Sequence, residues 1–510
     1  MTPPPPRPTR AERPARTASI PPARRPRGAA LALAVAAALA LGGCAGPARA
    51  PAAALATELP TTWSQAPAGD TTARTPLPPQ WWQTLGDATL DTLMQQALAH
   101  NTDLAAARAA LAQAEALRDA REATLGPSLS LSASAQRSKS GGAPAGNAFA
   151  TTLGASFTPD LFGGNQAAFS AAQADARAAW ASLAGTRLTL TANLALTYID
   201  LRSQQQRLEI AERNLAAQQS TRALTAWRVQ AGLASSLDLE QATQAVEQTA
   251  AAMVALRTAI GQDVHALAVL SGQPPAALRE TLPPPAPLPQ ASTAPALAAP
   301  AEVLRQRPDV RAAEARVQAA LARLDQAAAA RWPSVSLSAS LGLRSLTLGG
   351  LLDGSVANAL LASLAVPLFD GGALAAQQRA QAAALEQSRA QWTGTVLAAL
   401  KDVENALLAL RQDAERLQHL QAAATAARNA ELMAQYRFRS GVIDFRTVLD
   451  AQRATLSTQD AVEVQRATLL ADQVRLMQAL GGGWSPDASA AEPGSPTSRA
   501  DAAPTPPASS

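Results

Sequence analysis

The chain has 510 residues, of which 47% are hydrophobic, and it carries 43 Lys and Arg against 39 Asp and Glu. Its single Cys excludes an internal disulfide framework and a Cys-rich metal site. Residues 1–43 hold seven Arg and one acidic residue, so the remaining chain has 36 basic and 38 acidic side chains. This balance, without a dense basic run, gives no electrostatic reason to bind nucleic acid.

The N-terminal 43 residues have the pattern of an export signal. Residues 1–27 are rich in Pro and Arg, and residues 28–41 form an apolar run. That run is shorter than the ~20 apolar residues of a membrane-spanning helix and is typical of a signal peptide. It ends in Leu41-Gly42-Gly43-Cys44, which resembles a bacterial lipobox. The resemblance implies cleavage before Cys44, lipidation of Cys44 and, with Ala45 next, delivery to the outer membrane; a spare or buried thiol is the alternative.

An internal repeat divides the rest of the chain. The first copy contains Asp103, then a helical run, and then Pro127-Ser128-Leu129-Ser130-Leu131-Ser132. The same order recurs 206 residues later, as Asp309, a helical run and Pro333-Ser334-Val335-Ser336-Leu337-Ser338. Two further blocks recur in the same order, residues 159–164 as 367–372 and residues 228–233 as 437–442. Four matches in one order indicate a duplicated structural unit.

The repeat and the composition together predict the domain organisation. The expected parts are a signal peptide (1–43), a lipidated N-terminal segment (44–84), a first repeat (85–280), a Pro-rich linker (281–300), a second repeat (301–484) and a disordered tail (485–510). Strands are expected at about 127–158 and 333–366, and helical hairpins at about 164–271 and 373–480. Trp81 and Trp82 fit either a packed collar or a membrane interface.

Each unit contains segments with the period-two alternation of β-strands. Apolar residues occupy positions 129, 131 and 133 in the first copy and 335, 337, 339 and 341 in the second, with Ser between them. Return strands follow at 149–157 and 360–366. Each unit therefore predicts one β-hairpin with strands of about 9–11 residues, enough to cross a bilayer when tilted. A thin soluble β-sandwich is the alternative.

Long helices follow each hairpin. Residues 164–230 contain no Pro and one interior Gly, which predicts a helix on the order of 100 Å long. A second helix is expected over 239–270 after a turn at Gly232, and the same design recurs over 373–439 and 445–480 with a turn at Gly441. Such long helices with Ala-rich seams predict antiparallel coiled-coil hairpins.

The strand count then constrains the assembly. Four strands cannot close a barrel, and an open sheet in lipid would leave its edge amides unsatisfied. Three copies would supply 12 strands, enough for a hollow barrel with the Ser-rich face toward water. We therefore expect a mainly α protein with a pair of transmembrane β-hairpins, forming a trimeric 12-stranded β-barrel continued by a coiled-coil barrel of long α-helices.

These features resemble the outer-membrane efflux protein family, the TolC/OprM-like exit ducts, in its lipoprotein branch. The resemblance covers about residues 60–484 and rests on the lipobox, the duplicated unit, Asp160-Leu161-Phe162-Gly163-Gly164, and Gly441 followed by Val448-Leu449-Asp450-Ala451-Gln452-Arg453. It implies a homotrimer in the outer-membrane lipid, a periplasmic adaptor protein and an inner-membrane transporter of the resistance–nodulation–division type. The implied function is a passive exit duct for small molecules in a tripartite efflux pump.

The resemblance also assigns two groups of residues. Asp450 and Arg453 occupy the motif with which relatives close their periplasmic aperture, and Arg446 stands where close relatives carry an apolar residue. Ordinary solvated coiled-coil charges are the alternative interpretation. The turns that relatives present to adaptor proteins match Ala231, Gly232, Leu233, Ser440, Gly441 and Val442.

The sequence gives no catalytic constellation. His100, His265 and His419 lie far apart in helical stretches, and no phosphate-binding loop is present, so we expect no enzyme activity, cofactor or metal. Two other functions remain open from the sequence. One is a lipid-anchored periplasmic coiled-coil scaffold without a pore, and the other is the outer-membrane duct of a type I protein secretion system.

Overall fold

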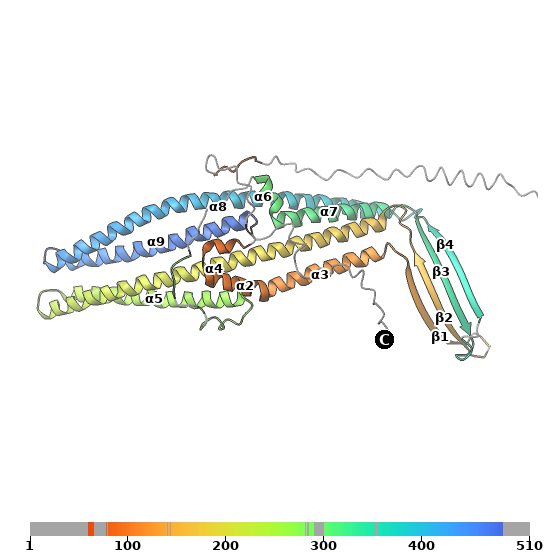
Figure 1. Ribbon diagram of the computed structural model, residues 1–510, viewed down its shortest axis with the longest axis horizontal. Coiled ribbons are helices and arrows are strands. Elements are labelled where there is room, and N and C mark those ends of the chain that lie inside the picture. The colour runs from red at the N-terminus through yellow and green to blue at the C-terminus, as the bar shows by residue number, and fades with distance from the viewer. Residues whose placement is uncertain are drawn as a thin grey trace, which may run out of the picture. The chain divides into compact units, whose positions relative to one another are not determined.

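The computed structural model describes residues 60–65, 78, 80–139, 141–142, 144–280, 282, 285–289, 300–351 and 355–482. The predicted signal peptide, Cys44, most of the predicted linker and the predicted C-terminal tail lie outside these residues. The described elements are mostly helices, with one four-stranded sheet (Figure 1).

Seven of the described elements make up the first part of the fold. They are η1 (Trp81–Leu85), α2 (Ala88–His100), α3 (Thr102–Ala123), β1 (Ser128–Ser138), β2 (Gly146–Phe157), α4 (Gly164–Gln230) and α5 (Ser236–Leu270). After α6 (Pro300–Gln306), the second part contains α7 (Pro308–Ala329), β3 (Ser334–Ser345), β4 (Ser355–Ala365), α8 (Ala373–Arg439) and α9 (Phe445–Ala479). The long helices α4 and α8 each have 67 residues, and α5 and α9 each have 35.

Two element boundaries differ from the expectation for local chemical reasons. Helix α5 begins at Ser236 rather than residue 239, because the Ser235 side chain and Asp238 form a capping box. Pro300 was expected to end the linker but begins α6, where it is buried; Pro is favoured in the first turn of a helix because its missing N–H would have no partner there.

The four strands form one antiparallel sheet in the order β1-β2-β3-β4. Each hairpin pairs internally, and β2 joins β3 with Leu153 opposite Leu341, so the two hairpins share one continuous sheet. Leu131 on β1 and Leu360 on β4 are 72% and 83% exposed, and the described residues hold no second sheet to cover them. The soluble β-sandwich alternative is therefore wrong, because a sandwich would bury these leucines.

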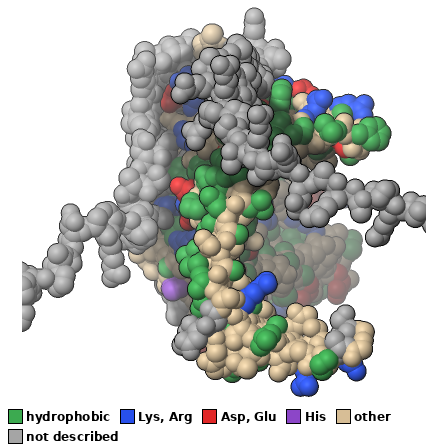
Figure 2. Space-filling view, turned by 90° about the vertical axis from the view of Figure 1, so that its right-hand side faces the viewer, with side chains coloured by type: hydrophobic (Ala, Val, Ile, Leu, Met, Phe, Trp, Pro, Cys, Tyr) green, Lys and Arg blue, Asp and Glu red, His purple; other side chains and the backbone are tan. Residues whose placement is uncertain are grey.

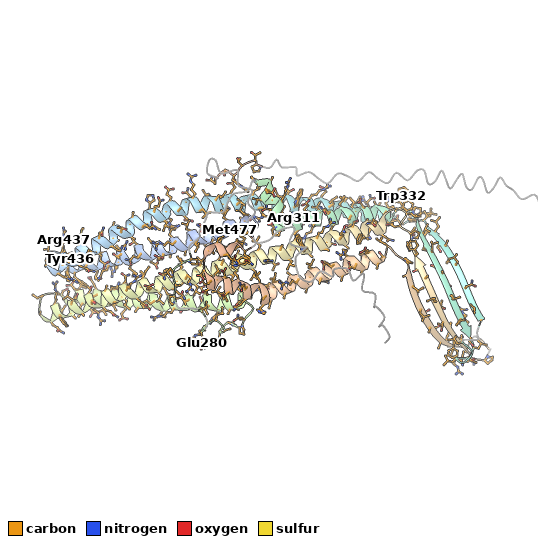
Figure 3. All side chains as sticks on the ribbon, in the orientation of Figure 1. Glu280, Arg311, Trp332, Tyr436, Arg437 and Met477 are labelled. Atoms are coloured by element: carbon orange, nitrogen blue, oxygen red, sulfur yellow. The ribbon has the colours of Figure 1, made fainter. Side chains whose placement is uncertain are left out.

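The sheet meets the helices where α3, α4, α7 and α8 end or begin (Figure 1). Phe162, just before α4, stacks on Trp332, just after α7, with ring centroids 5.5 Å apart. Trp332 lies at this junction, and Tyr436 and Arg437 lie at the far end of α8 (Figure 3). Hydrophobic side chains reach the surface at the sheet end of the molecule (Figure 2).

The main hydrophobic core lies near the middle of the long helices. Trp81 and Trp82 are 1% and 3% exposed and pack with residues of α2, α4, α5 and α9. The Tyr198 hydroxyl donates to Asp87 Oδ2 at 2.7 Å, and it accepts from Arg202 Nε at 3.0 Å. Burial is the main reason that the pKa of Tyr198 rises to about 12. The two tryptophans are therefore packed core residues and not a membrane-interface pair.

Candidate functional site: the helical hairpin tips

The two turns predicted as partner contacts have closely similar geometry. Gly232 has φ +70° and Gly441 has φ +75°, which is the left-handed region favoured by glycine. After each glycine an amide closes the helix end, with Leu233 N donating to Arg228 O at 2.7 Å and Val442 N donating to Arg437 O at 2.9 Å. Leu233 and Val442 are 77% and 71% exposed, so both turns present an apolar side chain to solvent.

The helix that leaves the second tip is fixed by a small core. Phe445, Val448 and Leu449 at the start of α9 are buried against Phe438 of α8. Ala242 and Ala245 of α5 belong to the same cluster, which ties the two hairpins together below their tips. Gln452 Nε2 also donates to Thr221 Oγ1 of α4 at 3.1 Å.

A contact between the two tips was not predicted from the sequence. The Arg228 guanidinium lies 4.2 Å from the centroid of the Phe438 ring, and its Nη2 donates to Phe438 O at 3.3 Å. In the sequence, Arg228 stands out only as the first residue of a repeated block. Nothing in the spacing of residues 228 and 438 signals this contact, because it depends on how the two halves pack.

The three residues predicted for the aperture lie on one side of α9. Asp450 Oδ2 is 4.0 Å from Arg446 Nε, and Asp450 Oδ1 is 3.9 Å from Arg453 Nη1. Their side chains are 80%, 62% and 48% exposed in the order Arg446, Asp450, Arg453. Because these distances are long for charged hydrogen bonds, the contacts within α9 are weak and leave the Asp450 oxygens able to accept from another partner.

The N-terminus of α9 is capped by an acidic side chain. Asp444 Oδ1 accepts from Thr447 N at 3.1 Å and from the Thr447 hydroxyl at 2.5 Å. These hydrogen bonds lower the pKa of Asp444 from its ordinary value, so the cap stays ionised at neutral pH. The cap and the glycine together fix the direction in which the Asp450 face of α9 points.

Metal or catalytic chemistry has no support at the tips. Within the described part of the chain, no group of three or more His, Cys, Asp or Glu residues could hold a metal ion. The surface near the tips consists of exposed charges and exposed apolar or aromatic side chains, among them Trp227, Leu233, Leu237, Tyr436 and Val442. Such a surface is suited to contact with another protein or with another copy of the chain.

Comparisons with known proteins agree with this architecture. The family model "Outer membrane efflux protein" matches residues 93–273 and 299–482. The pyoverdine export outer membrane protein OpmQ of Pseudomonas aeruginosa is 31% identical over 420 residues, covering 80% of this chain and 88% of the relative. The toluene efflux pump outer membrane protein TtgC of Pseudomonas putida is 31% identical over 414 residues, covering 79% and 85%.

Solved structures show the same fold. The outer-membrane channel OprN superimposes with a TM-score of 0.78 at 31% identity, covering 85% of this chain and 99% of that chain. The open state of the MtrE outer membrane channel of Neisseria gonorrhoeae gives a TM-score of 0.74 at 27% identity, covering 84% and 96%. The chain therefore belongs to the outer membrane efflux protein family, a family of non-enzymatic efflux channels of the outer membrane.

Proposed function

We propose that three copies of this chain form one passive duct that carries small molecules through the outer membrane. The observation that supports this most strongly is the open four-stranded sheet, whose outer strands β1 and β4 each have one edge without a strand partner among the described residues. A sheet edge in lipid would leave backbone amides unsatisfied, so a spanning sheet must close on itself. Three copies would join 12 strands into one barrel.

The two faces of the sheet suit a water-filled barrel. Leu131, Leu153, Leu341 and Leu360 project from one face, and serines such as Ser130 project from the other. Leucines on the outside would contact lipid, and serines on the inside would line a wet pore. Below the membrane the long helices of three copies would continue the pore into the periplasm. The two separate matches of the family model support a duplicated unit as the origin of this arrangement.

The duct would receive its cargo from partner proteins. We place a periplasmic adaptor at the tips around Gly232 and Gly441, and an inner-membrane transporter of the resistance–nodulation–division type as the energy source. The exposed Leu233 and Val442, with the exposed Trp227 and Leu237 beside the first turn, are apolar contacts available for an adaptor. A photo-reactive residue at position 233 or 442 should cross-link to the adaptor in living cells, whereas the same residue at the exposed position 254 on α5 should not.

The Asp450 face of α9 would form the aperture at the periplasmic end. In a threefold assembly, three Asp450 carboxylates would form an acidic ring, and Arg453 and Arg446 of neighbouring copies would close it by charged hydrogen bonds. The weak contacts that these residues make within one chain favour such an exchange of partners. Because Arg446 adds three cations, this aperture would carry more positive charge than that of relatives with an apolar residue there.

The N-terminus would anchor the duct to the membrane. Cys44 lies at the end of a lipobox-like sequence, and acyl chains on it would add membrane affinity of about 0.8 kcal/mol per buried CH₂. Metabolic labelling with a palmitate analogue would test this directly. We expect the wild-type chain to be labelled and Cys44→Ser to be unlabelled.

Conductance of the purified protein in planar bilayers tests the proposal. We expect discrete channels whose activity follows the trimer fraction of a sizing column. A stable trimer without channels would favour a coiled-coil scaffold. A duct that exports a polypeptide in cells lacking its transporter of the resistance–nodulation–division type would favour type I secretion. A chain that stays monomeric in detergent and in native membranes would overturn the proposal.

A further inference from the structure

The pairing register assigns each strand residue to one of the two faces of the sheet. Residues that pair directly lie on the same face, and successive residues along a strand alternate between the faces. Leu131 pairs with Leu153, and Leu153 pairs with Leu341, so these residues define a leucine face. Ser132 pairs with Thr152 on the opposite face, which comprises the even-numbered residues of β1, β2 and β3 and the odd-numbered residues of β4. This second face lines the pore in the proposed duct, and we call it the pore face.

Small uncharged residues occupy most of the pore face. Ser, Ala, Gly and Thr fill all of its positions except Gln136, Leu361 and Arg344. Arg344 therefore has the one charged side chain on the pore face of the described strands. It pairs directly with Ala150 of β2 and with Ser355 of β4, whose side chains are too short to cover it.

Arg344 lies near the end of the sheet that is farthest from the helices (Figure 1). It is the second-last residue of β3, and the first residue, Ser334, is at the helical end. At a rise of about 3.3 Å per residue and a strand tilt of about 40°, Arg344 is about 25 Å above Ser334. The apolar band of an outer-membrane barrel is also about 25 Å tall. In the proposed duct, Arg344 is therefore at the outer mouth of the pore.

No acidic side chain of the sheet can neutralise Arg344. The four described strands contain neither Asp nor Glu. The Arg344 side chain is exposed, and within the described part of the chain its guanidinium makes no hydrogen bond or ion pair. Closing a barrel would bring together further copies of the same strands. The guanidinium therefore stays without an acidic partner on the pore face, whatever the strand register between copies.

Other charges at this end of the sheet do not cancel the charge of Arg344. Arg137 of β1 lies on the leucine face, where it pairs directly with Asn147. The β1–β2 turn contains Lys139, and the β3–β4 turn contains Asp353, which lies outside the described residues. These two turn residues have opposite charges, so together they leave the positive charge of Arg344 in each copy.

We infer that Arg344 makes the outer mouth of the proposed duct selective for anions over cations. The inference rests on the proposed trimeric duct, in which three Arg344 side chains form a ring around the pore. Rings of Arg or Lys side chains select anions in channels. Arg keeps its charge at every physiological pH and binds carboxylates and phosphates through two parallel hydrogen bonds. Small organic anions that carry such groups are therefore the substrate class that this mouth favours.

The reach of the ring's electric field depends on the salt concentration. The Debye length is about 10 Å at 0.1 M salt and about 3 Å at 1 M salt. The field of the guanidinium groups therefore extends into the pore at 0.1 M salt and is confined to their own surface at 1 M salt. Selectivity that comes from charge falls as the salt concentration rises, whereas selectivity that comes from pore width does not.

Reversal potentials of the purified full-length protein in planar bilayers test the inference. A KCl gradient around 0.1 M gives the ratio of chloride permeability to potassium permeability. We expect Arg344→Gln to lower this ratio roughly twofold, because it removes the charge of the ring, and Arg344→Glu to lower it further. Arg344→Lys keeps the charge and should keep the wild-type ratio. At 1 M salt all four proteins should have nearly the same ratio, because the charges are screened.

Arg137→Gln is the matched control, because it removes an arginine from the same end of the sheet but from the leucine face. It should keep the wild-type permeability ratio, and an equal shift in Arg137→Gln would overturn the assignment of the faces. Unchanged ratios in both Arg344→Gln and Arg344→Glu would overturn the inference and leave the duct intact. A wild-type protein without channels would refute the duct and the inference with it.

Organic ions of matched size test the substrate class. Gluconate and N-methylglucamine have similar six-carbon chains and opposite charges. Liposomes that contain the wild-type protein should admit gluconate faster, relative to N-methylglucamine, than liposomes that contain Arg344→Gln. The same relative rate in both proteins would overturn the assignment of organic anions as the favoured substrate class.

Discussion

The Arg228 side chain of α4 lies against the Phe438 ring at the end of α8, with the guanidinium carbon 4.2 Å from the ring centroid. This contact connects the tips of two helical hairpins whose sequences are 210 residues apart. Relative movement of the two tips would have to break it. The structure therefore couples the tip near Gly232 to the tip near Gly441.

Arg228→Ala tests this coupling. We expect the unfolding free energy to fall by about 1 kcal/mol, the usual value for a cation–π contact at a partly exposed site. We also expect faster hydrogen exchange in residues 434–442. Arg228→Lys should retain part of the effect because the ammonium can still lie over the ring. Arg222→Ala, at an exposed position on α4, is the control. Unchanged exchange at the second tip in Arg228→Ala would show that the contact does not couple the tips.

Asp450→Ala combined with Arg453→Ala tests the aperture. Loss of the proposed acidic ring and its arginine partners should raise single-channel conductance severalfold and sensitise cells to large antibiotics. Glu247→Ala, an exposed acidic residue on α5, should leave both measurements unchanged. If the double variant conducts like the wild type, these residues are ordinary surface charges.

Asp263 on α5 gives a prediction about pH. Burial, and then the neighbouring Asp200 carboxylate, raise the pKa of Asp263 to about 6. Because this folded-state value lies above the unfolded one, ionisation of Asp263 destabilises the folded chain above pH 6, and the penalty disappears as the pH falls through 6 toward 4. Asp263→Asn should therefore raise the thermal midpoint at pH 7.5 and have little effect at pH 4.5. Asp103→Asn, at an exposed site, should leave the thermal midpoint unchanged at both pH values.

Arg307 before α7 is a structural cation. Its Nη1 donates to Ala479 O at 2.8 Å, and its Nη2 donates to Asp309 at 2.7 Å and to Asp402 at 3.4 Å. Its side chain is 10% exposed, so Arg307→Ala would leave Asp402 and the end of α9 without these hydrogen bonds. We expect a loss of about 3 kcal/mol or more in unfolding free energy, measured by chemical denaturation. Arg305 is exposed, so Arg305→Ala is the control. An equal loss of unfolding free energy in Arg305→Ala would contradict the structural role of Arg307.

Much of the fold could be predicted because long periodic segments leave few alternatives. The Pro-free stretch from Gly164 to Gln230 forms a helix with those same bounds. Alternation after Pro127 and Pro333 identified β1 and β3, because one-sided burial or lipid contact requires a period of two. Arg446, Asp450 and Arg453 were selected only by resemblance to a family motif, and their i,i+4 and i,i+3 ion pairs on α9 appear in the structure.

The parts that were missed depend on contacts between distant segments. The Arg228–Phe438 contact requires knowing how α4 lies against α8, and no local pattern contains that information. The environment of Trp81 and Trp82 was equally open from the sequence, since indole suits a core and an interface alike. Their burial beside Tyr198 became evident only from the packed helices.

The matched lengths of the helices have a mechanical consequence. Helices α4 and α8 have the same number of residues, and so do α5 and α9, so both tips project equally far from the membrane. The span of the protein is therefore set by four helices together. Removing seven residues from all four would withdraw the tips by about 10 Å while keeping nearly the same sides of each helix in contact. Removing seven from α4 and α5 alone would leave a staggered rim that no flat partner surface could meet evenly.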